Sequence, residues 1–197
     1  MAAKNAKTAK KKTEVAHYTV PGLTDQQGLE LASVLQDRLH ALNDLQLVLK
    51  HAHWNVTGRG FISVHEMLDP QVELVRGFVD EVAERIATLG YAPNGLSGAI
   101  VAERSWDDYS IGRAGVYEHL AALDLVYTGL LEDHRKALAK AGDIDPVTED
   151  MLIGQVKELE LFQWFVRAHL ENDGGELANA GARTEKGAAA KVRSKKK

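Results

Sequence analysis

Two pairs of potential metal ligands recur at helical spacing within this 197-residue chain. His65 and Asp69 are four residues apart, and so are Asp80 and Glu84. Residues four apart lie on the same face of a helix, so each pair could present both side chains to one ion. Imidazole and carboxylate groups suit Fe(II), Mn(II) or Zn(II). Because the chain contains no cysteine, thiolate sites are excluded and any metal must bind through nitrogen and oxygen.

The segment from His65 to Asp69 also invites comparison with the zinc-protease motif. In that motif two histidines four residues apart share a helical face. Here Asp69 occupies the second position, and no third ligand is evident downstream. The zinc-protease interpretation is therefore disfavoured.

Helix geometry keeps the two pairs apart within one chain. Asp69 and Asp80 are separated by 11 positions, which is about 16 Å along a helix and too far for one metal shell. The two pairs are centred near the middle of the helix that carries them. An antiparallel two-fold pairing of this helix with its copy would therefore place His65 and Asp69 opposite the partner's Asp80 and Glu84. We expect a homo-oligomer with sites shared between chains.

Four long helices are predicted to position these residues. Apolar spacing and capping patterns predict helices over 25–54 and 62–89, a third capped by Asp107, Asp108 or Ser110 and ending at Gly142, and a fourth from Pro146 to Gly174. The second opens on the capping-box pattern Ser63–Glu66, and Pro70 is expected to kink it. Residues 90–109 are too long for a tight turn. The pattern predicts an all-α, ferritin-like four-helix bundle with one long crossover, containing a short helix, between the second and third helices.

Charge is segregated between the ends and the middle of the chain. Residues 1–12 contain five lysines and no acid, and residues 183–197 contain seven lysines or arginines against one acid. The stretch between them holds 12 basic and 27 acidic residues. Because both ends offer few apolar side chains, we expect basic disordered tails at 1–17 and 176–197 around a bundle at 18–175.

The tails could bind nucleic acid or simply add solubility. The cations that would contact DNA phosphates are Lys4, Lys7, Lys10, Lys11, Lys12, Arg183, Lys186, Lys191, Arg193, Lys195, Lys196 and Lys197. Such contacts would be independent of base sequence and would weaken with salt. No apolar run approaches the roughly 20 residues of a membrane span, and no signal-peptide stretch follows the basic start. We therefore expect a soluble cytoplasmic protein without a membrane partner.

Three other candidates have alternative interpretations. His51 and His53 are two residues apart, so at most one of them can face a site. Trp54 is by default a packing residue. Asp143 and Asp150 are most simply charges at helix ends, but symmetry could gather several copies into a cation pore.

Several runs of the sequence resemble the Dps family, DNA-binding proteins from starved cells. They are His53 to Asn55, Phe61 to Asp69, Asp80 to Arg85, Trp106 to Tyr109 and Phe162 to Phe165. The resemblance spans about residues 18–175 and fills every ligand position of the family pattern.

This resemblance implies a ferritin-like mini-ferritin that assembles as a hollow dodecamer built from two-fold dimers. Its ferroxidase sites would take His53, His65 and Asp69 from one chain and Asp80 and Glu84 from the partner. The sites would oxidise Fe(II), preferentially with hydrogen peroxide, and the shell would store iron as a ferric mineral. Members of the family with basic tails also bind double-stranded DNA, which implies a nucleoid-associated protein that protects DNA from oxidative damage.

The resemblance also bears on the pore candidates and on Trp54. The resemblance implies that Asp150 and Asp143 line an acidic three-fold pore, and that Trp54 beside the site intercepts stray oxidising equivalents. Two rival functions remain open. One is an oxygen-using mini-ferritin without a DNA role, and the other is an architectural nucleoid protein with a vestigial metal site.

Overall fold

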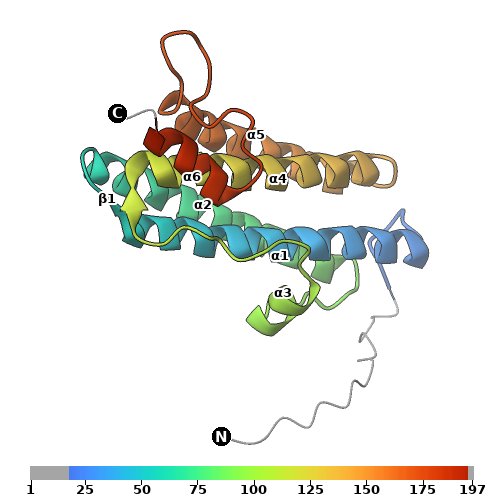
Figure 1. Cartoon of the computed structure of the whole chain (residues 1–197). Coiled ribbons are helices and arrows are strands. Elements are labelled where there is room, and N and C mark those ends of the chain that lie inside the picture. Colours follow the sequence, from blue (N-terminus) through green and yellow to red (C-terminus); the bar gives the residue numbers. More distant parts are fainter. Residues whose placement is uncertain (1–17, 195–197) are drawn as a thin grey trace, which may run out of the picture.

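Four long helices form the body of the computed structural model, which describes residues 18–194 (Figure 1). They are α1 (Asp25–Asn55), α2 (Phe61–Thr88), α4 (Val116–Gly142) and α5 (Pro146–Ala168). α1 packs along α2 and α4 packs along α5, and one apolar core joins the two pairs. The all-α four-helix bundle predicted from the sequence is confirmed.

The connection from α2 to α4 is the predicted long crossover. It contains the short helix α3 (Ser97–Glu103) and then runs beside α1 to the far end of the bundle (Figure 1). There the short strand β2 (Ala114–Gly115) pairs in parallel with β1 (Val56–Thr57), which follows α1. This two-residue pairing was not predicted, and it fixes the turn between α1 and α2 against the end of the crossover.

Local capping rules place two helix starts correctly. Thr24 and Gln27 form the capping box of α1, with the Gln27 amide donating to Thr24 Oγ1 at 3.3 Å. Asp145 caps α5 by accepting from the Thr148 amide at 2.9 Å, and Pro146 occupies the first helical position. α2 continues through Pro70 without a break between its ends.

The start of α2 lies within one residue of the predicted position, but its predicted capping box is wrong, and so is the predicted start of α4. α2 begins at Phe61 behind Gly60, whose φ of 81° lies in the left-handed region, and the Ser63 hydroxyl donates to the Gly60 carbonyl instead of capping the helix. α4 begins at Val116 rather than after residues 107–110, because the chain first pairs with β1 through β2.

The predicted disorder of residues 176–197 is wrong for part of that range. Residues 185–194 form α6 (Glu185–Ser194), which packs on α4 and buries Ala188, Ala189 and Val192. Glu185 accepts hydrogen bonds from the Ser110 amide and hydroxyl. A few small apolar side chains therefore suffice to dock this helix when a complementary surface is present. Residues 1–17 and 195–197 lie outside the described part of the chain.

Across residues 18–194, none of the helices combines the length and the apolar character that a membrane crossing requires.

A buried histidine couples the stability of the bundle to pH. His134 on α4 is fully buried, and its Nε2 donates to Gln155 Oε1 at 3.2 Å. Its Nδ1 has no hydrogen-bond partner within residues 18–194. Burial lowers the pKa of His134 to about 4 from an ordinary value of 6.5. Between these two values the unfolded chain binds a proton that the folded chain does not.

We expect His134 to make the folded state less stable as the pH falls from 6.5 to 4. This one residue should account for a loss of about 3 kcal/mol in the free energy of unfolding. Chemical unfolding at fixed protein concentration and stepped pH measures the loss. His134→Gln should flatten it, whereas His169→Gln at the exposed end of α5 should leave it unchanged. An equal pH dependence in wild type and His134→Gln would contradict this assignment.

Candidate metal centre

The turn between α1 and α2 brings two predicted ligands into contact. His53 lies in the last turn of α1 and His65 lies near the start of α2. Their imidazole rings stack with centroids 3.6 Å apart and planes inclined by 22°. The connecting residues reverse direction tightly, with Gly58 at φ 93°. His53 is 7% exposed, while His65 is half-buried and its ring centroid lies 5.0 Å from that of Phe61.

Reciprocal hydrogen bonds fix both rings. Nδ1 of His53 lies 2.9 Å from the carbonyl oxygen of His65, and Nδ1 of His65 lies 2.9 Å from the carbonyl oxygen of His53. Because a carbonyl oxygen only accepts, each Nδ1 must carry the proton. In a neutral imidazole the proton is then absent from Nε2, whose lone pair is free to bind a metal. Backbone geometry thus prepares two nitrogen ligands.

Asp69 extends this pair along α2. Its Oδ1 lies 3.3 Å from Nδ1 of His53 and 2.6 Å from Nζ of Lys50. The hydrogen bond from Lys50 holds the pKa of Asp69 below its ordinary value, against a smaller effect of burial and with the help of both histidines. The carboxylate is therefore ionised, and Lys50 neutralises it within the chain.

The second predicted pair lies farther along α2. Asp80 and Glu84 are both exposed, and neither makes a hydrogen bond or ion pair with any residue of 18–194. Within those residues no group of three or more His, Cys, Asp or Glu side chains is arranged to hold a metal ion. The structure thus brings His53, His65 and Asp69 together in one chain and leaves the other two ligands separate.

Apolar side chains are exposed beside the histidine pair. Leu47 and Trp54 are seven residues apart on one face of α1 and are 60% and 72% exposed, and Ile62 on α2 is 56% exposed. Trp54 is therefore not packed in the core of its own chain, and the packing interpretation is wrong within the chain. Exposed apolar groups clustered in this way mark an interaction surface.

Comparison with known proteins places the chain in a family. A model of the ferritin-like domain matches residues 32–174. The DNA protection during starvation protein of Mycolicibacterium smegmatis is 60% identical over 178 residues, which cover 90% of this chain and 97% of that protein. This chain belongs to the Dps family. The resemblance noted in the sequence is thereby confirmed.

Solved Dps structures share the fold. A Mycobacterium smegmatis Dps structure is similar with a TM-score of 0.84 at 59% identity, over 85% of this chain and 95% of the other. A Dps protein of Streptomyces coelicolor gives a TM-score of 0.82 at 61% identity, over 84% and 99% of the two chains.

In this Dps chain the neighbouring histidine faces away from the candidate site. Nε2 of His51 lies 2.9 Å from the Ile111 carbonyl oxygen of the crossover, and its ring meets Tyr109 edge to face. The prediction that at most one of His51 and His53 faces the site is confirmed. Sequence reasoning missed Lys50, although its position three residues before His53 places it on the same helical face.

The candidate pore residues of the Dps chain are exposed near the junction of α4 and α5. Asp143 is the C-cap of α4, and Asp150 lies in the first two turns of α5. Neither makes a hydrogen bond or ion pair with the rest of residues 18–194. Asp145 between them is occupied, because it caps α5 and pairs with Arg85 at 2.5 Å.

Only part of the predicted DNA-contacting set can be placed. Lys191 donates to the Ala180 carbonyl, and Arg193 pairs with Glu118, so α6 already engages two of these cations. Arg183 and Lys186 are exposed beside the start of α6. The remaining cations lie outside the described residues, at Lys4, Lys7, Lys10, Lys11, Lys12, Lys195, Lys196 and Lys197.

Proposed function

We propose that this protein is a ferroxidase and iron store that also binds and protects DNA. Its site would combine His53, His65 and Asp69 of one chain with Asp80 and Glu84 of a second copy. The observation that carries the proposal is the paired Nδ1 hydrogen bonds of His53 and His65, which leave two Nε2 ligands beside a half-exposed carboxylate. A protein interior that needed these rings only for packing would not require this mutual arrangement.

The second copy would complete the site from the exposed end of α2. Asp80 and Glu84 are free of partners within residues 18–194 and would supply two carboxylates. The exposed Leu47, Trp54 and Ile62 support burial of this face against another chain. We infer that such dimers assemble further into a hollow dodecamer.

The substrate of this site would be Fe(II). Histidine and carboxylate ligands suit Fe(II), and carboxylates favour the ferric product. Hydrogen peroxide would accept one electron from each of two Fe(II) ions, which avoids release of hydroxyl radical. Lys50 would keep Asp69 ionised before iron arrives. This ion pair would break when the iron cation binds the Asp69 carboxylate. Exposed Trp54 would serve as a sink for stray oxidising equivalents as well as a contact for the partner.

Entry of iron and binding of DNA would use other parts of the assembly. We propose that Asp143 and Asp150 of several copies line an entrance for cations, since both carboxylates are exposed at one end of the bundle. DNA would be held by the basic tails and by exposed Arg183 and Lys186. Charge on many tails of one particle would add up to strong, sequence-independent binding, which suits a protein of the cytoplasm and nucleoid.

Anaerobic loading of the assembled protein with Fe(II), followed by either hydrogen peroxide or oxygen, tests the iron function. We expect rapid oxidation with peroxide, slower oxidation with oxygen, and a ferric mineral that co-purifies with the assembly. Faster oxidation with oxygen would identify an oxygen-using mini-ferritin. No iron-dependent consumption of peroxide would indicate an architectural protein and would contradict the proposal.

A further inference from the structure

A buried arginine of α1 has no hydrogen-bond or ion-pair partner among residues 18–194. Arg38 is 7% exposed, and its Nη1 is buried without a hydrogen bond within residues 18–194. No ion pair within 4 Å involves its guanidinium in the same part of the chain. A buried charge without hydrogen bonds costs several kcal/mol on the usual scale. Such a group requires an explanation, and a bound anion is the simplest one.

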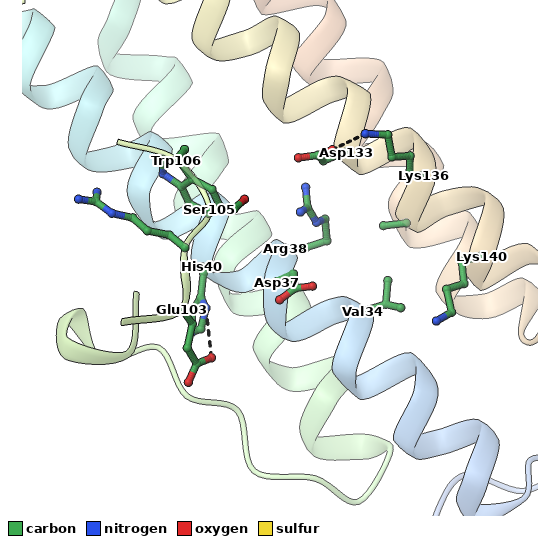
Figure 2. A pocket seen from close by; sticks show the side chains of 12 residues that line it. Val34, Asp37, Arg38, His40, Glu103, Ser105, Trp106, Asp133, Lys136 and Lys140 are labelled. Atoms are coloured by element: carbon green, nitrogen blue, oxygen red, sulfur yellow. Dashed lines mark hydrogen bonds and ion pairs between the residues drawn. The ribbon is translucent and has the colours of Figure 1, made fainter. Parts of the chain in front are cut away.

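Arg38 lies where two cavities between α1 and α4 adjoin. The first has a volume of about 400 Å³, and Figure 2 shows Arg38 reaching into it from α1 with Asp133 on the facing helix α4. The second has a volume of about 660 Å³ and shares Arg38, Ser105, Trp106 and Asp133 with the first. Cavities of this size hold small organic ligands.

The other cations near Arg38 are already paired. Lys136 bonds to Asp133 at 2.8 Å, and Lys140 pairs with Glu30 at 3.1 Å. Arg104 lies 3.5 Å from Asp44 and also pairs with Asp108. Arg38 is therefore the cation of the first cavity that still lacks an anion within residues 18–194. Burial lowers the pKa of Arg38, although Asp133 and Asp37 oppose this effect, and one more carboxylate would stabilise its charged form.

The lining of the second cavity indicates that the bound anion has an apolar body. Its walls include the apolar side chains Leu45 and Val48 of α1, Leu125 and Leu130 of α4, and Trp106 of the crossover. Arg183 and Lys186 also line the second cavity, but around the two cavities together seven carboxylates outnumber six Lys and Arg side chains. This balance disfavours a dianion such as phosphate more than a singly charged group. A carboxylate matches the fork of a guanidinium and bears one charge.

We propose that the groove between α1 and α4 binds a small monocarboxylate with an apolar body. The carboxylate pairs with Arg38, and the apolar body lies along Leu45, Leu125 and Leu130. This site faces away from the histidine pair, because it lies on the middle of α1 under the crossover. It is independent of the iron function.

Calorimetric titration of the full-length assembly with octanoate tests the site. We expect saturable binding with one site per chain, and Arg38→Met should weaken it by about tenfold or more. Arg135→Met is the matched control, since Arg135 is exposed on α4 and pairs with Glu160 away from the cavities. Octanol should bind more weakly than octanoate, because it has the same body without the charge.

Thermal unfolding distinguishes a ligand-binding arginine from a structural one. Without octanoate, Arg38→Met should unfold at the same or a higher temperature than wild type, because it removes an unpaired buried charge. Octanoate should stabilise wild type and Arg135→Met but not Arg38→Met. The proposal is overturned if wild type fails to bind octanoate, if Arg38→Met binds it equally well, or if inorganic phosphate binds through Arg38 in its place.

Discussion

A chain carrying Asp80→Asn and Glu84→Gln is expected to fold and assemble but to oxidise Fe(II) about a hundredfold more slowly than wild type, or slower still. Both carboxylates are exposed and unpaired within residues 18–194, so their loss should not disturb the chain itself. In the proposed site they supply two of the five protein ligands. Stopped-flow absorbance of the ferric product after peroxide addition measures the initial rate.

The matched control for this variant is Glu73→Gln on the same helix. Glu73 is exposed and pairs with Arg76, a contact that contributes little to stability. It should leave the oxidation rate within about twofold of wild type. A double variant that retains the wild-type rate would show that Asp80 and Glu84 are surface charges and would remove the second half of the proposed site.

Loss of charge from both tails should abolish DNA binding. A variant that lacks residues 1–12 and carries glutamine at Arg183, Lys186, Lys195, Lys196 and Lys197 keeps α6 docked, because the contacts of Lys191 and Arg193 are untouched. The acidic body repels a polyanion, so the affinity for duplex DNA should fall by about a thousandfold. Iron oxidation should not change.

Gel-shift titration at several salt concentrations measures this loss. The deletion of residues 1–12 alone, or the glutamine substitutions alone, should weaken DNA binding and reduce its dependence on salt. The combined variant should produce no gel shift. Lys136→Gln with Lys140→Gln removes two lysines of the body and should bind DNA as wild type does. If the combined variant assembles and still shifts DNA, the contact lies on the folded surface and not on the free cations of the tails.

Local sequence rules predicted much of the bundle, but they failed where tertiary contacts determine the start of a helix or the order of a segment. Thr24 and Asp145 act as caps through hydrogen bonds within a few residues, so their helices begin where the sequence predicts. The start of α4 instead depends on the pairing of β2 with β1, two segments that are far apart in sequence. The composition of α6 predicts disorder, but Ala188 and Val192 find a surface on α4.

The candidate site shows the same division. Helical spacing identified His65 with Asp69 and Asp80 with Glu84, and the length of α2 predicted that the pairs lie apart. His53 was assigned through the family resemblance, since spacing alone left the choice between it and His51 open. The stacked rings and their exchanged hydrogen bonds depend on how the turn after α1 closes, which no local pattern reports.

Co-assembly of two inactive chains tests most directly whether the iron site is shared. One chain carries Asp80→Asn and Glu84→Gln, and the other carries His65→Ala and Asp69→Ala. With random pairing, half of the dimers are mixed and each mixed dimer contains one intact site. The mixture should therefore recover about one quarter of the wild-type rate of Fe(II) oxidation. If mixed dimers form, as affinity tags on the two chains would show, and no activity returns, the site is not shared between chains and the account is wrong.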